Sequence, residues 1–346
     1  MSNFDPPVHI SVILVTWNSA ATLVRCLDCL AAQTRKDFAV VLVDNGSTDG
    51  GLDEVESRWP ELTLRVEYLE LNRGFAVANN IGARLARGKW LALLNSDAFP
   101  GPDWLEQLLQ AAENNLEFTF FASRQIQANA NSLLDGAGDA FHVSGLAWRR
   151  YAGFPADQFG LEPEEVFSPC AAAGLYSLQA FLQVGGFDED FFSYLEDVDL
   201  GFRLRLQGHR CLYVPGAVVH HIGSGTLGVK SDFALYLFHR NLVWVFVQNM
   251  PSSQFWKYLP AHLLANLVYL VYHTLCGRGK ILWRAKWDAL RGLPRILRKR
   301  REIQSHRCTS LVDLERMMLK GLLQPYLLDY HAKKADKVSD STAKRS

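Results

Sequence analysis

The amino-acid sequence predicts an α/β fold with an open sheet, parallel in its first half. Along the first hundred residues, short apolar runs rich in β-branched side chains alternate with amphipathic segments, which is the pattern of parallel βαβ units. Hydrophobic residues make up 49% and charged residues 21% of the 346 residues, a globular composition. Because the chain exceeds the usual ~100 to 200 residues of one domain, we expect a large domain with an appendage, or two domains.

The alternation places each early element. We expect strands at 9–18, 38–50, 62–72 and 90–100, each ending in a polar cluster, and helices at 20–34, 51–59 and 74–88. In open parallel sheets, ligands bind beyond the carboxyl ends of the strands. The polar clusters are therefore where we expect the chemistry.

The rest of the chain is organised differently. Between about 120 and 190 the pattern is less regular, as expected for the mixed second half of the same domain, and a helix near Glu196 and a strand from Cys211 follow. Long aromatic helices come next. We therefore expect an α/β domain at 1–230, a helical aromatic and basic region at 231–330, and a polar, disordered tail at 331–346.

The net charge is zero, but it is unevenly distributed. Residues 277–301 hold ten Lys or Arg and one Asp, so of the totals of 36 and 36 there remain 26 basic and 35 acidic residues elsewhere. A basic segment on an acidic body indicates an anionic partner surface, either lipid or nucleic acid.

Beside this basic segment, residues 258–277 contain no Asp, Glu, Lys or Arg. A stretch of ~20 residues is just long enough to span a bilayer. However, Pro260, His262, Asn266 and His273 make a spanning helix costly, so we expect an amphipathic helix on the membrane surface. A spanning helix and an ordinary packed helix are the alternatives.

The cysteines and the first residues bear on the compartment. Six cysteines are scattered through apolar runs rather than spaced as a disulfide framework, which indicates a reducing compartment. Cys26 and Cys29 form a CxxC inside a predicted helix without a second Cys/His pair, so we expect neither a zinc nor a redox site. Residues 1–10 lack the basic and apolar regions of a signal peptide. We expect a cytoplasmic protein.

Two strand ends carry carboxylates. In "VDNGSTDG" a capped turn explains the residues after Asp44, while Asp44 itself could accept the imide N–H of a uracil or thymine ring. In "LLNSDAFP", Asn95 and Asp97 are i and i+2, so on a strand they point the same way. That pair suits a ribose hydroxyl and a Mg²⁺ or Mn²⁺ ion that bridges phosphates. An Asx turn before Pro100 is the structural alternative.

Two further motifs supply a cation and an imidazole. In "NRGFAVANN", Arg73 could meet a diphosphate and Gly74 lets the backbone approach a ligand, although a lone arginine is more often a surface residue. In "VVHHIGSG", His220 and His221 point to opposite faces of a strand, so at most one can be a metal ligand.

A group of acids opens the helix in "FFSYLEDVDLGFRLRLQGHR". Carboxylates in a first helical turn interact well with the helix dipole, so a helix start explains them structurally. Glu196, Asp199 and Arg203 share one face, as a solvated, salt-bridged stripe would, and an apolar stripe lies opposite. Asp197 belongs to neither stripe. It lies on the flank with Gly201, whose missing side chain leaves room beside it for a ligand.

These motifs, in this order from "TWN" to "VVHHIGSG", resemble the family-two glycosyltransferases of the GT-A fold, most closely the bacterial rhamnosyltransferase-like branch, over about residues 8–250. The resemblance implies a Rossmann-like open mixed sheet with helices on both faces. It also implies site roles: Asp197 as catalytic base, Asp97 and His221 at the metal, and Thr16, Asn18, Asp44, Arg73, Gly74 and Asn95 at the nucleotide sugar. Many relatives have a carboxylate where Asn95 stands, which weakens the expectation of metal dependence.

The predicted activity is inverting transfer of a sugar from a UDP- or dTDP-sugar, with dTDP-rhamnose as the guess for the branch. The acceptor would be a hydroxyl of a glycan or a polyprenyl-linked lipid in cell-surface polysaccharide synthesis, with Mg²⁺ or Mn²⁺ as cofactor. The expected partners are the donor, the acceptor and the cytoplasmic membrane face, not nucleic acid. A sugar nucleotidyltransferase, which would need a Gly-rich phosphate loop, and a non-enzymatic membrane adaptor are the alternatives.

Overall fold

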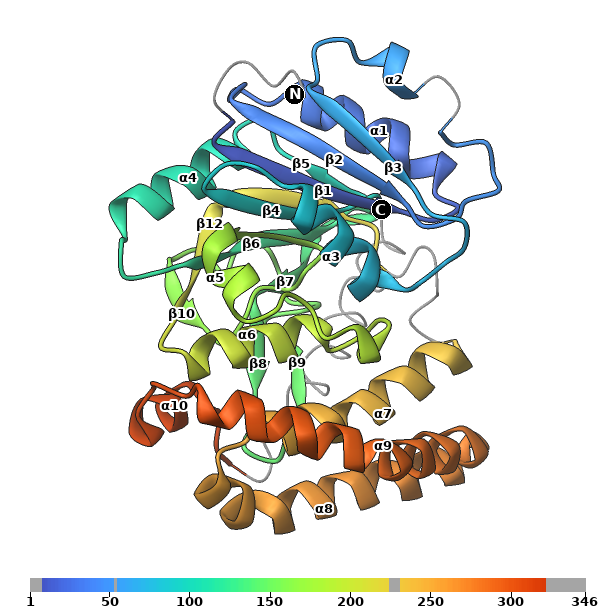
Figure 1. The fold of residues 1–346 in the computed structure, drawn as a ribbon, viewed down its shortest axis with the longest axis vertical. Coiled ribbons are helices and arrows are strands. Elements are labelled where there is room, and N and C mark those ends of the chain that lie inside the picture. The colour runs from blue at the N-terminus through green and yellow to red at the C-terminus, as the bar shows by residue number, and fades with distance from the viewer. Residues whose placement is uncertain (1–7, 53–54, 224–230, 322–346) are drawn as a thin grey trace, which may run out of the picture.

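The computed structural model describes residues 8–52, 55–223 and 231–321. Figure 1 shows a large twisted sheet in the upper part of the molecule, with helices on both of its faces, and a layer of long helices at the opposite end. The α/β prediction is therefore confirmed. The tail expected at 331–346 lies outside the described residues.

The strands are β1 (Ile10–Thr16), β2 (Phe38–Asp44), β3 (Leu64–Tyr68), β4 (Trp90–Asn95), β5 (Ala98–Pro100), β6 (Phe120–Gln127), β7 (Ala130–Ala137), β8 (Asp139–Phe141), β9 (Ala147–Arg149), β10 (Glu164–Val166), β11 (Ala173–Ser177) and β12 (Cys211–His221). The helices are α1 (Ala20–Ala31), α2 (Val55–Arg58), α3 (Phe75–Leu85), α4 (Trp104–Asn114), α5 (Leu178–Gln183), α6 (Glu196–Leu206), α7 (Asp232–Asn249), α8 (Ser252–Leu275), α9 (Gly279–Ser305) and α10 (Leu311–Met317), with a 3₁₀ turn η1 (Glu189–Phe191).

The first half of the sheet is parallel, as predicted. Its order is β3-β2-β1-β4, with β1 hydrogen-bonded to β2 on one side and to β4 on the other. Side chains alternate along β1, so Val12 and Leu14 pack on the face covered by α1 and α4, and Ile13 packs on the face covered by α3 and α5. The strand order reverses between β1 and β4, and such a reversal is where open α/β sheets bind ligands.

The second half of the sheet is mixed. β11 runs antiparallel between β4 and β6, and β12 lies parallel to β6 on its other side. The strand expected at 90–100 is two strands: β4 ends at Asn95, and β5 pairs antiparallel with β12. Asp97 therefore lies in the turn between two strands, and the alternation expected along a single strand does not orient it.

The helical layer packs on the sheet domain through α6. The predicted apolar stripe of α6 is confirmed, because its members join a core shared with α7 and α9: Leu195, Val198, Phe202 and Leu206. The expected domain boundary near residue 230 falls beside residues 224–230, which are outside the described part of the chain, and α7 begins at Asp232. Among the described helices, none has the length and apolarity needed to cross a membrane.

The sequence predicted that Glu196, Asp199 and Arg203 form a solvated stripe on α6. This prediction is wrong about solvation, because all three side chains are buried. Asp199 is 0% exposed, and its carboxylate accepts hydrogen bonds from Arg203 Nε at 2.8 Å, Asn249 Nδ2 at 2.6 Å and the amide of Gln248. The last two residues come from α7. The stripe is therefore a polar joint between α6 and the helical layer rather than a surface in water.

Candidate active site

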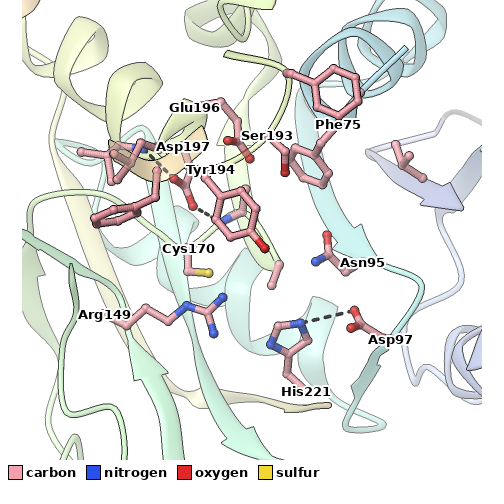
Figure 2. A pocket seen from close by; sticks show the side chains of 18 of the residues that line it. Phe75, Asn95, Asp97, Arg149, Cys170, Ser193, Tyr194, Glu196, Asp197 and His221 are labelled. Carbon is pink, nitrogen blue, oxygen red and sulfur yellow. Dashed lines mark hydrogen bonds and ion pairs between the residues drawn. The ribbon is translucent and has the colours of Figure 1, made fainter. Parts of the chain in front are cut away.

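A cavity of about 340 Å³ opens where β1 and β4 end, at the reversal of strand order. Five of the predicted site residues line it: Gly74, Asn95, Asp97, Asp197 and His221. Figure 2 shows Asp197 and Glu196 at the top of the cavity, and Arg149, His221 and Asp97 along the bottom. Asn95 and Asp97 thus share the cavity through the turn after β4, and His221 is brought beside them by β12.

The other predicted residues, Thr16, Asn18, Asp44 and Arg73, are not among those that line the cavity. Asp44 is buried, and its Oδ1 accepts the backbone N–H of Ser47 at 3.1 Å. Asn18 accepts the backbone N–H of Thr48 at 2.8 Å through its Oδ1. The capped turn therefore accounts for the contacts of Asp44, while its recognition of a base stays a prediction.

Asn45 supports the segment around Gly74, a role that sequence reasoning missed. Its Oδ1 accepts the backbone N–H of Arg73 at 2.9 Å, and its Nδ2 donates to Asn72 Oδ1 at 3.0 Å. Gly74 has φ +88°, and a Cβ at this position would lie 2.6 Å from the ring of Phe192. Glycine is therefore required both by the left-handed backbone and by the close approach of the aromatic ring.

A chain of polar contacts runs along the bottom of the cavity. His221 Nδ1 lies 2.8 Å from Asp135 Oδ2, and Arg149 forms an ion pair with the same carboxylate. His221 Nε2 lies 3.3 Å from Asp97 Oδ1, in a direction that leaves this buried nitrogen without a hydrogen-bond partner among the described residues. Burial lowers the pKa of His221, but the carboxylates of Asp135 and Asp97 outweigh it and raise the pKa overall.

This arrangement fits a divalent cation. Asp135 accepts the Nδ1 proton, so a His221 ring that releases its Nε2 proton would offer the Nε2 lone pair to a cation beside Asp97, as in carboxylate–histidine–metal sites. Within the described part of the chain, no group of three or more His, Cys, Asp or Glu side chains is arranged so that it could hold a metal ion. The remaining ligands of a cation held at Asp97 and His221 would have to be phosphate oxygens and water, which is how Mg²⁺ and Mn²⁺ bind in many phosphate sites.

Three neighbouring carboxyl groups line the cavity, those of Asp139, Glu196 and Asp197. Burial raises the pKa of each, and it raises the pKa values of Asp139 and Glu196 well above the usual range, where the charge of Asp197 adds to the effect. Asp197 also has a raised pKa because of burial, but it accepts backbone N–H groups from Ala171 at 3.2 Å and Val198 at 2.8 Å, which favour its charged form. Neighbouring carboxyls cannot all ionise. Among these three groups, the backbone N–H donors favour the charged form at Asp197.

The loop before α6 is held in an uncommon conformation. Phe192, Tyr194 and Leu195 all have positive φ, between +66° and +69°, although none is a glycine. Asn241 of α7 donates through Nδ2 to the carbonyls of Ser193 at 2.9 Å and Tyr194 at 2.7 Å. Strained backbone of this kind persists where surrounding structure holds it, and it clusters at functional sites. The helical layer thus sets the position of Tyr194 and Asp197.

Comparisons with known proteins agree with this geometry. The family model described as glycosyl transferase family 2 matches residues 11–178. A relative from Mycobacterium tuberculosis (strain CDC 1551 / Oshkosh), named N-acetylglucosaminyl-diphospho-decaprenol L-rhamnosyltransferase, is 34% identical over 276 residues, which cover 71% of this chain and 86% of the relative. The chain belongs to glycosyl transferase family 2.

Solved structures show the fold of this glycosyltransferase. GalNAc-T7, crystallised with UDP, GalNAc and Mn²⁺, matches with a TM-score of 0.58 at 20% identity, covering 72% of this chain and 49% of that one. The mannosyltransferase PcManGT of Pyrobaculum calidifontis, in complex with GDP-Man and Mn²⁺, matches with a TM-score of 0.54 at 18% identity, covering 87% and 85%. The predicted GT-A fold is confirmed, and the chain is an enzyme, not an adaptor.

The sequence predicted room for a ligand beside Gly201, next to Asp197 of the glycosyltransferase, and this prediction is wrong. The space is filled, because a Cβ at Gly201 would lie 2.3 Å from Cβ of Ser168. Gly201 permits this close packing, and Ser168 in turn donates to Asp139 at 3.3 Å. Asp197 still faces the cavity, because the loop before α6 aims it there.

Several residues of the glycosyltransferase site were missed from the sequence. Asp139 and Arg149 are register partners in the β8–β9 hairpin, and Asp135 lies just before it on β7. In the sequence this stretch shows only glycine-rich turns. The available signal was the pair of acids followed by two arginines, "DGAGDAFHVSGLAWRR", which flanks a short hairpin with groups of opposite charge.

Proposed function

We propose that this glycosyltransferase moves a sugar from a nucleotide diphosphate sugar to a hydroxyl acceptor in one displacement that inverts the anomeric carbon. The observation that carries the proposal is the carboxyl group of Asp197, which faces the cavity across from Asp97 and His221 and accepts two backbone N–H groups. A single displacement needs one base on the acceptor side and stabilisation of the leaving group on the other. The two sides of the cavity supply these groups.

Asp197 is the general base in this proposal. Its carboxylate accepts the proton of the acceptor hydroxyl while the oxygen forms a bond to the anomeric carbon. The bond from that carbon to the diphosphate oxygen breaks, and its electron pair leaves with the nucleotide diphosphate. Because burial raises the pKa of Asp197, its carboxylate is a stronger base than an exposed aspartate.

In the proposal, Asp97 and His221 would hold Mg²⁺ or Mn²⁺, with the donor diphosphate completing the ligands. A cation bound there would supply positive charge to the leaving phosphates. An imidazole ligand favours Mn²⁺ over Mg²⁺, which prefers oxygen. Both solved structures compared above carry Mn²⁺. Arg149, in its ion pair with Asp135, places a positive charge in the same cavity, which adds to the stabilisation of the departing phosphates.

The donor is a UDP- or dTDP-sugar, with dTDP-rhamnose favoured, and the acceptor is a glycan or polyprenyl-linked lipid. Support comes from the name of the mycobacterial relative, a rhamnosyltransferase that acts on a diphospho-decaprenol, and from its match over most of both chains. In the proposal, Asp44 contacts the base, Asn95 the ribose, and Thr16, Asn18, Arg73 and Gly74 the rest of the nucleotide sugar. The reaction takes place at the cytoplasmic face of the membrane.

The Asp197→Asn variant tests the base. Asparagine keeps the size and one of the two oxygens that accept the backbone N–H groups of Ala171 and Val198, so we expect a folded variant with a small loss of melting temperature and nearly unchanged nucleotide affinity. Sugar transfer should fall by ~10² to 10⁴, the usual contribution of general-base catalysis. In the wild type, kcat/KM should decline as the pH drops through a value above ~3.9, the ordinary pKa of aspartate. A folded Asp197→Asn enzyme that retains substantial activity would assign the base to another residue.

A further inference from the structure

α8 presents an apolar face that nothing in the described structure covers. Its buried side carries Gln254, His262 and Ala265. Its opposite side exposes large apolar side chains in a helical repeat: Leu263 (59%), Leu264 (53%), Leu267 (55%), Val268 (41%), Val271 (50%), Tyr272 (55%) and Leu275 (83%). Soluble monomers rarely expose a continuous apolar patch of this kind unless it binds something.

α9 exposes a face of different character beside it. Leu282, Ala285, Ala289 and Ile296 are buried, whereas Trp283 (61%), Trp287 (57%), Leu290 (56%) and Leu297 (44%) are exposed. Exposed basic residues flank these side chains along the same helix: Lys280, Arg284, Arg291, Arg295, Arg298 and Arg301. Tryptophan and arginine at the edge of an apolar surface are typical of helices that lie at the boundary between water and lipid.

The buried sides of α8 and α9 contact α7. The ring of His262 on α8 stacks at 4.0 Å on Phe246 of α7, and Trp244 of α7 donates to the carbonyl of Ala289 on α9 at 3.0 Å. Both helices therefore rest on α7 with their buried sides. In Figure 1, α8 and α9 lie together at the end of the molecule farthest from β1–β4. α8 and α9 also contact each other, and we call their exposed sides together the α8–α9 face.

The charge pattern selects the occupant of the α8–α9 face. Residues 277–301 carry ten basic residues and one acidic residue, while the rest of the chain has more acidic than basic residues. Two copies of the chain joined through this face would bring the same positive charges together, which opposes a symmetric dimer. An anionic lipid surface is complementary to it in both charge and apolarity.

We propose that the α8–α9 face docks the enzyme onto an anionic lipid bilayer, with both helices lying in the plane of the membrane. α8 inserts its uncharged side to the level of the acyl chains, and the tryptophans and arginines of α9 lie among the headgroups. The proposal concerns binding alone, so it does not depend on the identity of the sugar or the acceptor. It requires no spanning helix, and the described helices include none that could span.

Vesicle flotation of the full chain tests the proposal. Vesicles of phosphatidylcholine are compared with vesicles that also contain phosphatidylglycerol, and wild-type enzyme should float mainly with the anionic vesicles, with a blue shift of tryptophan fluorescence. Trp283→Ala/Trp287→Ala should reduce flotation by about tenfold or more, because apolar area buried in the interface is lost. Arg298→Gln/Arg301→Gln should reduce the preference for anionic vesicles.

The matched control is Leu116→Ala/Leu161→Ala, which removes apolar side chains that are 79% and 51% exposed on the sheet domain and should leave flotation unchanged. Transfer to a water-soluble acceptor should be equal in all these variants, which separates a failure of docking from a failure of the proposed reaction. The proposal is overturned if wild-type enzyme does not float, or if the tryptophan pair has no effect. A concentration-dependent dimer that the tryptophan pair disrupts, without any vesicle binding, would assign the face to a second copy instead.

Discussion

Replacing Asp135 with asparagine tests how the proposed metal site is assembled. Asp135 is not among the residues that line the cavity, so it is not expected to contact the cation itself. It accepts the proton of His221 Nδ1 at 2.8 Å and pairs with Arg149 on the same carboxylate. Asparagine can turn its NH₂ group toward Nδ1, which stabilises the tautomer with the proton on Nε2. That tautomer cannot bind a cation through Nε2. The substitution therefore prevents His221 from binding the cation although His221 itself is unchanged.

The size of the effect follows from these contacts. Loss of a carboxylate partner behind a metal-bound histidine costs about 10- to 100-fold in metal affinity. Here the loss should lie toward the upper end, because Arg149 loses its compensating charge and its positive field then acts on the same cavity. A 100-fold loss corresponds to about 2.8 kcal/mol of binding free energy.

The assay is Mn²⁺ binding in the presence of a nucleoside diphosphate, followed by electron paramagnetic resonance or calorimetry, with the melting temperature as a check on folding. Asp157→Asn is the matched control, since it makes the same chemical change at an exposed aspartate and should leave Mn²⁺ affinity unchanged. If a folded Asp135→Asn enzyme binds Mn²⁺ as the wild type does, His221 is not a ligand oriented by Asp135.

Two further predictions concern neighbouring acids. Asp97→Ala should abolish turnover and raise the concentration of Mn²⁺ required for nucleotide binding. Glu196→Gln should reduce activity less, because Glu196 lies on the opposite wall of the cavity. Equal, wild-type-like Mn²⁺ titrations for both variants would contradict this assignment. Asp199→Ala should destabilise the fold by about 3 to 5 kcal/mol, because it leaves Arg203 buried without its partner. Denaturant unfolding measures this cost, and a loss under about 1 kcal/mol would show that the joint between α6 and α7 contributes little.

The sequence predicted the part of the site that is built from local signals. Each parallel strand is a run of β-branched residues followed by a polar turn, so Asn95 and Asp97 could be placed at a strand end from a few neighbouring residues. His221 could be placed on a strand for the same reason. Asn95, Asp97 and His221 line one cavity because β4 and β12 run in the same direction and end at the same edge of the sheet.

The other wall of the cavity depends on contacts between distant segments. Nothing near Asp199 in the sequence shows that α7 covers it. The face of α6 that carries Asp199 and Arg203 was therefore predicted to be solvated, although it is buried. The space expected beside Gly201 is filled by Ser168, which is 33 positions away in the 346-residue chain. Arg149 and Asp135 meet because β7–β9 fold back on themselves, and a glycine-rich stretch gives no period from which to predict that.

The hydrogen bonds from Asn241 to the loop at 193–194 have a consequence for how this enzyme can be recombined. The family model ends at residue 178, whereas Asp197, His221 and Asn241 all follow it. A chimera could take its first half from this chain and its helical layer from a relative. The loop and Asn241, which holds it, then come from the same parent only if the junction precedes both. Crossovers placed between β11 and α5 keep the loop, α6 and α7 from one parent. Crossovers between β12 and α7 divide them, and the resulting enzymes should bind nucleotide but misplace the Asp197 carboxylate, the base in the proposed mechanism.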